Sequence, residues 1–207
     1  MLELGNGNFF FHIPRTGGNY TIRTCRGLRR NGVKPSMRHF GHKHGGPLNA
    51  CLRGDVERSF TILRPPIDWY RSFYRFRIYK HYGKGGMKPG HPLDFFIWKE
   101  AGGKVFSFNH FLTRVVKWYP FGYVTSLYCR FFPFVTDLLW LPNLTQQLPE
   151  LLGSWGYDGP ITLPPKPKNE SPKDIPAECS KSVEEKVNNA EMQIINYLIK
   201  NHFMEYR

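Results

Sequence analysis

The sequence predicts an α/β fold: a single domain with a central parallel β-sheet flanked by helices. The bulky apolar residues Phe9–Ile13 predict a buried strand, and a glycine turn and a helix over Asn19–Arg30 follow it. Phe60–Leu63 repeats the pattern, followed by two prolines that can open a helix. Strand–helix alternation predicts parallel strands, and 207 residues fit one domain over 1–207.

The remaining elements follow from apolar spacing and turn residues. Residues 36–46 indicate a short strand that ends in a polar loop rich in glycine and histidine. We expect short helices over 92–100 and 104–114, a strand over 134–137 and a helix over 141–152. The C-terminal helix over 183–206 has an apolar stripe of Val183, Val187, Ala190, Ile194 and Leu198. The Pro- and Lys-rich residues 158–176 predict a long loop, which indicates either a lid or disorder.

The charge of the chain favours an anionic partner. Its net charge is +13 and its pI about 9.7, which suits a nucleotide, a polyanion, nucleic acid or an acidic membrane surface. The four cysteines have no C-x-x-C spacing, so neither a zinc site nor a disulfide framework is predicted. We see no signal-peptide pattern and no apolar run of membrane-spanning length, and therefore expect a cytoplasmic protein without a membrane span.

The turn after the first strand has the features of an anion-binding site. Gly17 and Gly18 let the backbone turn tightly and approach a ligand closely. The helix that follows directs N–H groups and a partial positive charge at the turn, and Arg15 and Thr16 add a cation and a hydroxyl donor. We call residues 14–20 the 14–20 loop. The alternative is an ordinary strand–turn–helix corner.

Two common nucleotide motifs are absent. A P-loop requires a lysine and a hydroxyl residue after its last glycine, but Asn19 and Tyr20 follow Gly18. The dinucleotide motif G-x-G-x-x-G is also missing, since Gly5 and Gly7 precede the strand. An ATP-dependent kinase is therefore the less favoured enzyme class.

Two further places contain candidate functional residues. Arg64 lies where the second strand gives way to a helix, at the sheet edge where α/β folds bind ligands, and Ser72 lies about two turns later. The plain alternatives are a capping arginine and an ordinary helix residue. His39, His42 and His44 lie close together, but no cysteine or carboxylate completes a metal site, so we predict none. A catalytic base and a surface cluster without a role both remain open.

These segments resemble motifs of a known family. His12–Gly18 resembles the H-x-P-K-T-G-G loop of sulfotransferases that use 3'-phosphoadenosine-5'-phosphosulfate (PAPS). Ile62–Tyr74 is similar to the family's L-R-D-P-x-x-R-x-x-S-x-Y segment. Gly41-His42 resembles the G-H pair of carbohydrate 2-O-sulfotransferases, while Leu141–Leu144 and Asn169–Ser171 are weaker matches to E-N-L and N-x-S.

The resemblance implies a P-loop-like sulfotransferase fold and transfer of a sulfuryl group from PAPS to a hydroxyl or amine, leaving 3'-phosphoadenosine-5'-phosphate (PAP), with no metal. His42 is the implied base, with His44 as substitute, and Arg15 stabilises the transferring group. Residues implied to bind the donor are Pro14, Arg15, Thr16, Gly17, Gly18, Asn19, Tyr20, Arg64, Ser72, Lys168, Asn169 and Ser171. The implied acceptor is a small molecule or a glycan, and the basic residues 80–88 favour an acidic glycan or a similar polyanion. No nucleic-acid partner is expected.

The chain departs from the family pattern at three places. Arg15 replaces the usual lysine, Asn19-Tyr20 replaces a frequent hydroxyl pair, and Pro65 replaces the aspartate after the strand arginine. Arg15 keeps the positive charge but has a planar head group. The alternative function is a basic nucleotide- or polyanion-binding module without catalysis.

Overall fold

The computed structural model describes residues 1–5, 7–29, 32, 38–39, 56–82, 90–98, 104–158, 161 and 173–204. The chain divides into two compact units. Unit 1 comprises Met1–Arg64 and Leu127–Asn169, and unit 2 comprises Pro65–Ser126 and Glu170–Arg207. Unit 1 contains the β-sheet, whereas the described elements of unit 2 are helices.

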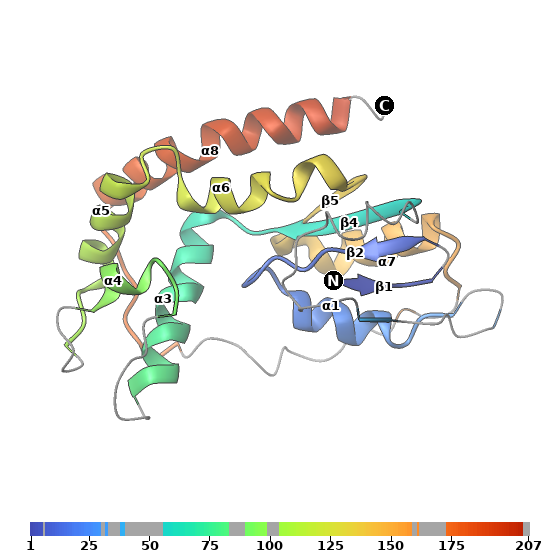
Figure 1. The fold of residues 1–207 in the computed structure, drawn as a ribbon, viewed down its shortest axis with the longest axis horizontal. Helices are drawn as coiled ribbons and strands as arrows, with labels where there is room; N and C mark the ends of the chain where they lie inside the picture. Colours follow the sequence, from blue (N-terminus) through green and yellow to red (C-terminus); the bar gives the residue numbers. More distant parts are fainter. Residues whose placement is uncertain are drawn as a thin grey trace. The chain divides into compact units, whose positions relative to one another are not determined.

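Within the described residues, the sheet of unit 1 has five strands in the order β3-β1-β2-β4-β5. Figure 1 labels β1, β2, β4 and β5. The strands are β1 (Leu2–Glu3), β2 (Asn8–Phe10), β3 (Arg38–His39), β4 (Arg58–Leu63) and β5 (Asp137–Trp140). The three strands β2, β4 and β5 pair in parallel, so the predicted parallel core is present. Their carboxyl ends therefore meet at one edge of the sheet.

The sheet is not parallel throughout, because β1 pairs antiparallel with both β2 and β3. The cause is a tight turn between β1 and β2. Gly5 and Gly7 have φ values of 88° and 70°, and the Asn8 amide donates to the Gly5 carbonyl at 3.1 Å. Such a short connection cannot carry the chain back for parallel pairing. The sheet is therefore mixed.

Helices α1 (Gly18–Cys25) and α7 (Leu144–Ser154) pack on the same face of this sheet. Ile22 and Cys25 of α1 and Leu148 of α7 share one hydrophobic cluster with Phe10 and Phe60. The short 3-10 helices η1 (Phe132–Phe134) and η2 (Leu141–Asn143) flank β5. Because residues 132–134 turn in this way, β5 begins at Asp137 and not at residue 134 as predicted.

The helices of unit 2 are α3 (Pro66–Tyr82), α4 (Asp94–Ile97), α5 (Phe108–Trp118) and α8 (Lys181–Met204), and α6 (Tyr123–Cys129) begins in this unit. Helix α8 packs against α3 and α5. Helix α5 begins four residues later than predicted, because Ser107 caps it by accepting from the His110 amide at 3.3 Å. The predicted start and end of α8 are close to those observed.

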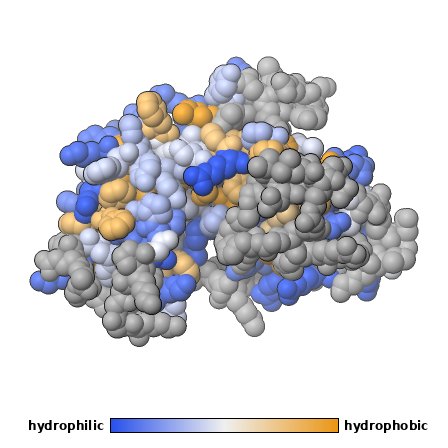
Figure 2. All heavy atoms as spheres, viewed as in Figure 1, coloured by the Kyte–Doolittle hydropathy of each residue, from blue (hydrophilic) through white to orange (hydrophobic). Residues whose placement is uncertain are grey.

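Both hydrophilic and apolar side chains are visible among the coloured residues on the face drawn in Figure 2. Among the residues with described side chains, Tyr79, Phe95, Trp118, Phe121 and Tyr197 are the most exposed large apolar ones. Within the described part of the chain, no helix combines the length and the apolar character needed to cross a bilayer.

Candidate functional site

The 14–20 loop begins where β2 leaves the sheet. The Phe11 amide donates to the Phe60 carbonyl at 2.9 Å, and the buried Thr61 hydroxyl donates to the Phe11 carbonyl at 2.7 Å. These bonds hold the chain beside β4 up to the turn. The turn then uses left-handed backbone at Arg15 and Gly17, with φ values of 70° and 85°. Positive φ is uncommon for a residue with a side chain and clusters at functional sites.

Gly18 is required by close packing against His12. A Cβ at Gly18 would lie 1.8 Å from His12 Cδ2, so no side chain fits there. The His12 imidazole is buried, at 6% exposed, and stacks near Phe10. Sequence reasoning gave His12 no role of its own, although it is the first residue of the loop motif. In this structure the His12 ring packs directly against the first residue of α1.

The hydroxyl of Thr16 is directed into the loop. It is fully buried, and Oγ1 donates to the Ile13 carbonyl at 2.8 Å. We predicted from the sequence that this hydroxyl donates to a ligand, but in the structure its proton is donated to the Ile13 carbonyl and stabilises the turn. Thr16 thus fixes the shape of the loop through this hydrogen bond.

Arg15 and Arg64 come together although they belong to different sequence motifs. An Nη1 proton of Arg64 is donated to the Arg15 carbonyl at 3.2 Å, across 49 residues of sequence. Burial and the nearby charge of Arg64 lower the pKa of Arg15 to about 10. Arg15 is thus still charged at neutral pH, and the charge of Arg64 is close enough to repel it. An anion next to both groups would reduce that repulsion.

The backbone of Arg64 is held by Tyr128. The Tyr128 hydroxyl accepts from the Arg64 amide at 3.1 Å and donates to the Arg64 carbonyl at 2.8 Å. Tyr128 is completely buried. Sequence reasoning missed this residue, because the aromatic residues 121–134 have no clear periodicity.

The other predicted residues have separate positions. Pro14 is half-buried before the turn, and Asn19 and Tyr20 lie in the first turn of α1, where Tyr20 also packs against the core. Ser72 is buried in α3, in unit 2. The predicted residues His42, His44, Lys168, Asn169 and Ser171 lie outside the described residues. Among the residues that are described, no three or more His, Cys, Asp or Glu side chains gather as metal ligands.

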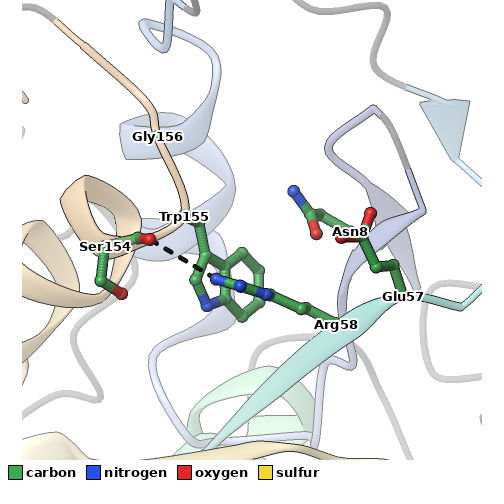
Figure 3. Close-up of a pocket in the computed structure, with 6 residues that line it drawn as sticks. All are labelled: Asn8, Glu57, Arg58, Ser154, Trp155 and Gly156. Atoms are coloured by element: carbon green, nitrogen blue, oxygen red, sulfur yellow. Dashed lines mark hydrogen bonds between the residues drawn. The ribbon is translucent and has the colours of Figure 1, made fainter.

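A pocket of about 230 Å³ lies at the opposite edge of the sheet, where β2 and β4 begin. Figure 3 shows Arg58 reaching across Trp155 towards the Ser154 carbonyl, to which it donates at 3.4 Å. Asn8, Glu57 and Gly156 complete the lining. None of the residues predicted to bind the donor lines this pocket. The arrangement around Arg15 and Arg64 is therefore the better candidate site.

Comparison of the chain with protein-family models, with curated proteins and with solved structures gave no match. A functional assignment therefore rests on the two sequence motifs and on the geometry around the 14–20 loop.

Proposed function

We propose that this chain is a sulfotransferase that moves a sulfuryl group from PAPS to a hydroxyl or amine acceptor. The observation that carries the proposal is the contact between the two motifs. Arg64 Nη1 donates to the Arg15 carbonyl at 3.2 Å, at the carboxyl ends of two parallel strands. Two basic side chains close together at this edge suit a ligand with two separated anionic groups, as PAPS has.

The 14–20 loop suits the 5'-phosphosulfate end of the donor. Helix α1 begins at Gly18 and has no acidic residue in its first turn. Its amino end therefore presents backbone N–H groups and a partial positive charge without competition from a local carboxylate. Arg15 adds a full charge at the same turn. On this proposal Arg64 binds the 3'-phosphate, and Ser72 remains its predicted second contact.

The proposed transfer requires one base and one group that stabilises negative charge. His42, or His44 in its place, takes the proton from the acceptor hydroxyl as the acceptor oxygen bonds to sulfur. The bond between sulfur and the bridging phosphate oxygen breaks, and PAP leaves with the electron pair. Arg15 and the amides of Gly17 and Gly18 stabilise the charge that develops on that oxygen. This chemistry needs positioning and charge stabilisation more than covalent catalysis.

Thermal unfolding with PAP tests the proposal. PAP at about a hundred times its dissociation constant should stabilise the folded chain by about 2.7 kcal/mol. Arg64→Ala should lose most of this response, because it removes the proposed 3'-phosphate contact. Arg26→Ala removes an equal charge from an exposed position after α1 and should keep the response. A response to ATP with magnesium but none to PAP would instead favour a kinase.

Transfer itself is tested separately from binding. His42→Ala should abolish most turnover of labelled PAPS while leaving the stabilisation by PAP intact. His44→Ala should have the smaller effect if His42 is the base. A wild-type chain that is stabilised by PAP but transfers nothing to hydroxyl or amine acceptors would be a nucleotide-binding module.

A further inference from the structure

Arg64 stands just beyond the last paired residue of β4. The parallel ladder between β4 and β5 ends at Leu63 and Trp140. Pro65 and Pro66 follow Arg64 and have no backbone N–H, so the chain cannot extend the ladder. The Arg64 peptide groups therefore need a partner from elsewhere, because unpaired buried backbone groups are costly.

Tyr128 supplies that partner with a single hydroxyl. It accepts from the Arg64 amide at 3.1 Å and donates to the Arg64 carbonyl at 2.8 Å. The ring is fully buried, so the hydroxyl is fixed in position. The guanidinium of the same residue then reaches the Arg15 carbonyl. A continuous series of hydrogen bonds thus connects Tyr128, Arg64 and the 14–20 loop.

We propose that Tyr128 is a positioning residue that sets the placement of Arg64 and thereby selects donors that carry a 3'-phosphate. This inference rests on the proposed function. Tyr128 itself need not touch the nucleotide. By fixing the Arg64 backbone, it sets the separation between the arginine fork and the turn at Arg15. That separation determines whether one ligand can contact both the Arg64 guanidinium and the turn at Arg15.

The test compares PAP with adenosine 5'-phosphate, which lacks the 3'-phosphate. The measured quantity is the ratio of their dissociation constants. In Arg64→Ala this preference for PAP should fall by about 10- to 100-fold, as expected for a lost charge-assisted hydrogen bond. In Tyr128→Phe the preference should fall by about tenfold, although the arginine is still present. A general loss of stability would weaken both ligands together and leave the ratio unchanged.

Tyr157→Phe is the matched control. The Tyr157 hydroxyl is also buried and also makes two bonds, accepting from Asn8 Nδ2 at 3.2 Å and donating to the Leu4 carbonyl at 2.9 Å. It lies at the other end of the strands, so its loss should lower stability without changing the PAP preference. An unchanged preference in Tyr128→Phe, with Arg64→Ala impaired, overturns the inference alone. A wild-type chain that shows no preference for PAP overturns the proposed function instead.

A measurement on the wild-type chain covers the case in which Tyr128→Phe does not fold. The Arg64 amide should exchange its hydrogen slowly even without nucleotide, because Tyr128 accepts its hydrogen bond. Exchange at Arg64 as fast as in an unstructured peptide would show that the hydroxyl does not hold this backbone and would overturn the inference.

Discussion

Arg15 has an environment that a lysine tolerates less well. Its pKa is lowered to about 10 by burial and by the charge of Arg64, yet it remains protonated at neutral pH. A lysine starts from a pKa of about 10.4, and the same two causes lower it further. An arginine at this position therefore keeps its charge although a second cation is nearby.

Arg15→Lys should make PAP binding dependent on pH. Deprotonation removes the positive charge, so binding weakens as the pH rises through the lowered pKa of the lysine. We expect the PAP dissociation constant of Arg15→Lys to be about three- to tenfold larger at pH 9 than at pH 7.5. The wild-type value should change little over this interval. Titration calorimetry at the two pH values measures both, and equal pH dependence in the two chains would contradict the argument.

Gly18→Ala should destabilise the chain. The new methyl group would lie 1.8 Å from the His12 ring, so either the imidazole or the start of α1 must move. Overpacking of this kind costs about 1–3 kcal/mol. Gly153→Ala is the control: its added Cβ meets nothing within 4 Å in helix α7, and alanine favours helix. Thermal unfolding should show a lower midpoint for Gly18→Ala and an unchanged or higher one for Gly153→Ala.

At the scale of elements, a buried carboxylate joins α8 to α6 within unit 2. Glu191, at 1% exposed, accepts from the amides of Val124 and Thr125 at 3.1 and 2.7 Å and from the hydroxyl of Tyr70. Burial and the charge of Glu191 raise the pKa of Tyr70 well above its usual value, so the phenol stays protonated and donates. The carboxylate thus caps the first turn of α6 from a distant helix.

Glu191→Gln should therefore lower the free energy of unfolding by about 3 kcal/mol, because an amide nitrogen cannot accept the hydrogen bonds that one carboxylate oxygen receives. Glu185→Gln, on an exposed position of the same helix, should change it by less than about 0.5 kcal/mol. Denaturant unfolding of both variants gives the comparison. A cost for Glu191→Gln no larger than that for Glu185→Gln would show that the cap adds little.

At the scale of the whole molecule, the net charge of +13 attracts many anions, whereas the proposed site selects one kind. Raising NaCl from about 50 to 500 mM should weaken binding of a single-stranded oligonucleotide by several orders of magnitude through counterion release. PAP makes fewer ionic contacts and should lose about tenfold or less. Fluorescence anisotropy can follow both ligands. Equal salt dependence would favour a polyanion-binding module over a defined nucleotide site.

The sequence predicted the parts of the fold that local patterns determine. The apolar runs before Pro14 and before Arg64 identified β2 and β4, and the stripe on α8 located that helix. The antiparallel β1 was missed, because its two residues and its glycine turn produce no periodic signal. Parallel pairing predicted that Arg15 and Arg64 lie at the same edge of the sheet. The roles of His12 and Tyr128 depend on tertiary packing, which local sequence patterns do not show.

The length of β4 sets where Arg64 lies along the sheet edge. Asn8 pairs with Arg58 and Phe10 with Phe60, so the number of residues after Phe60 determines how far Arg64 stands beyond the exit of β2. One added residue between Phe60 and Arg64 would carry the arginine about 3.3 Å further and turn its side chain to the other face. If Arg64 binds the donor as proposed, an insertion in this strand would impair binding for a geometric reason, even where every new residue is apolar and compatible with the core.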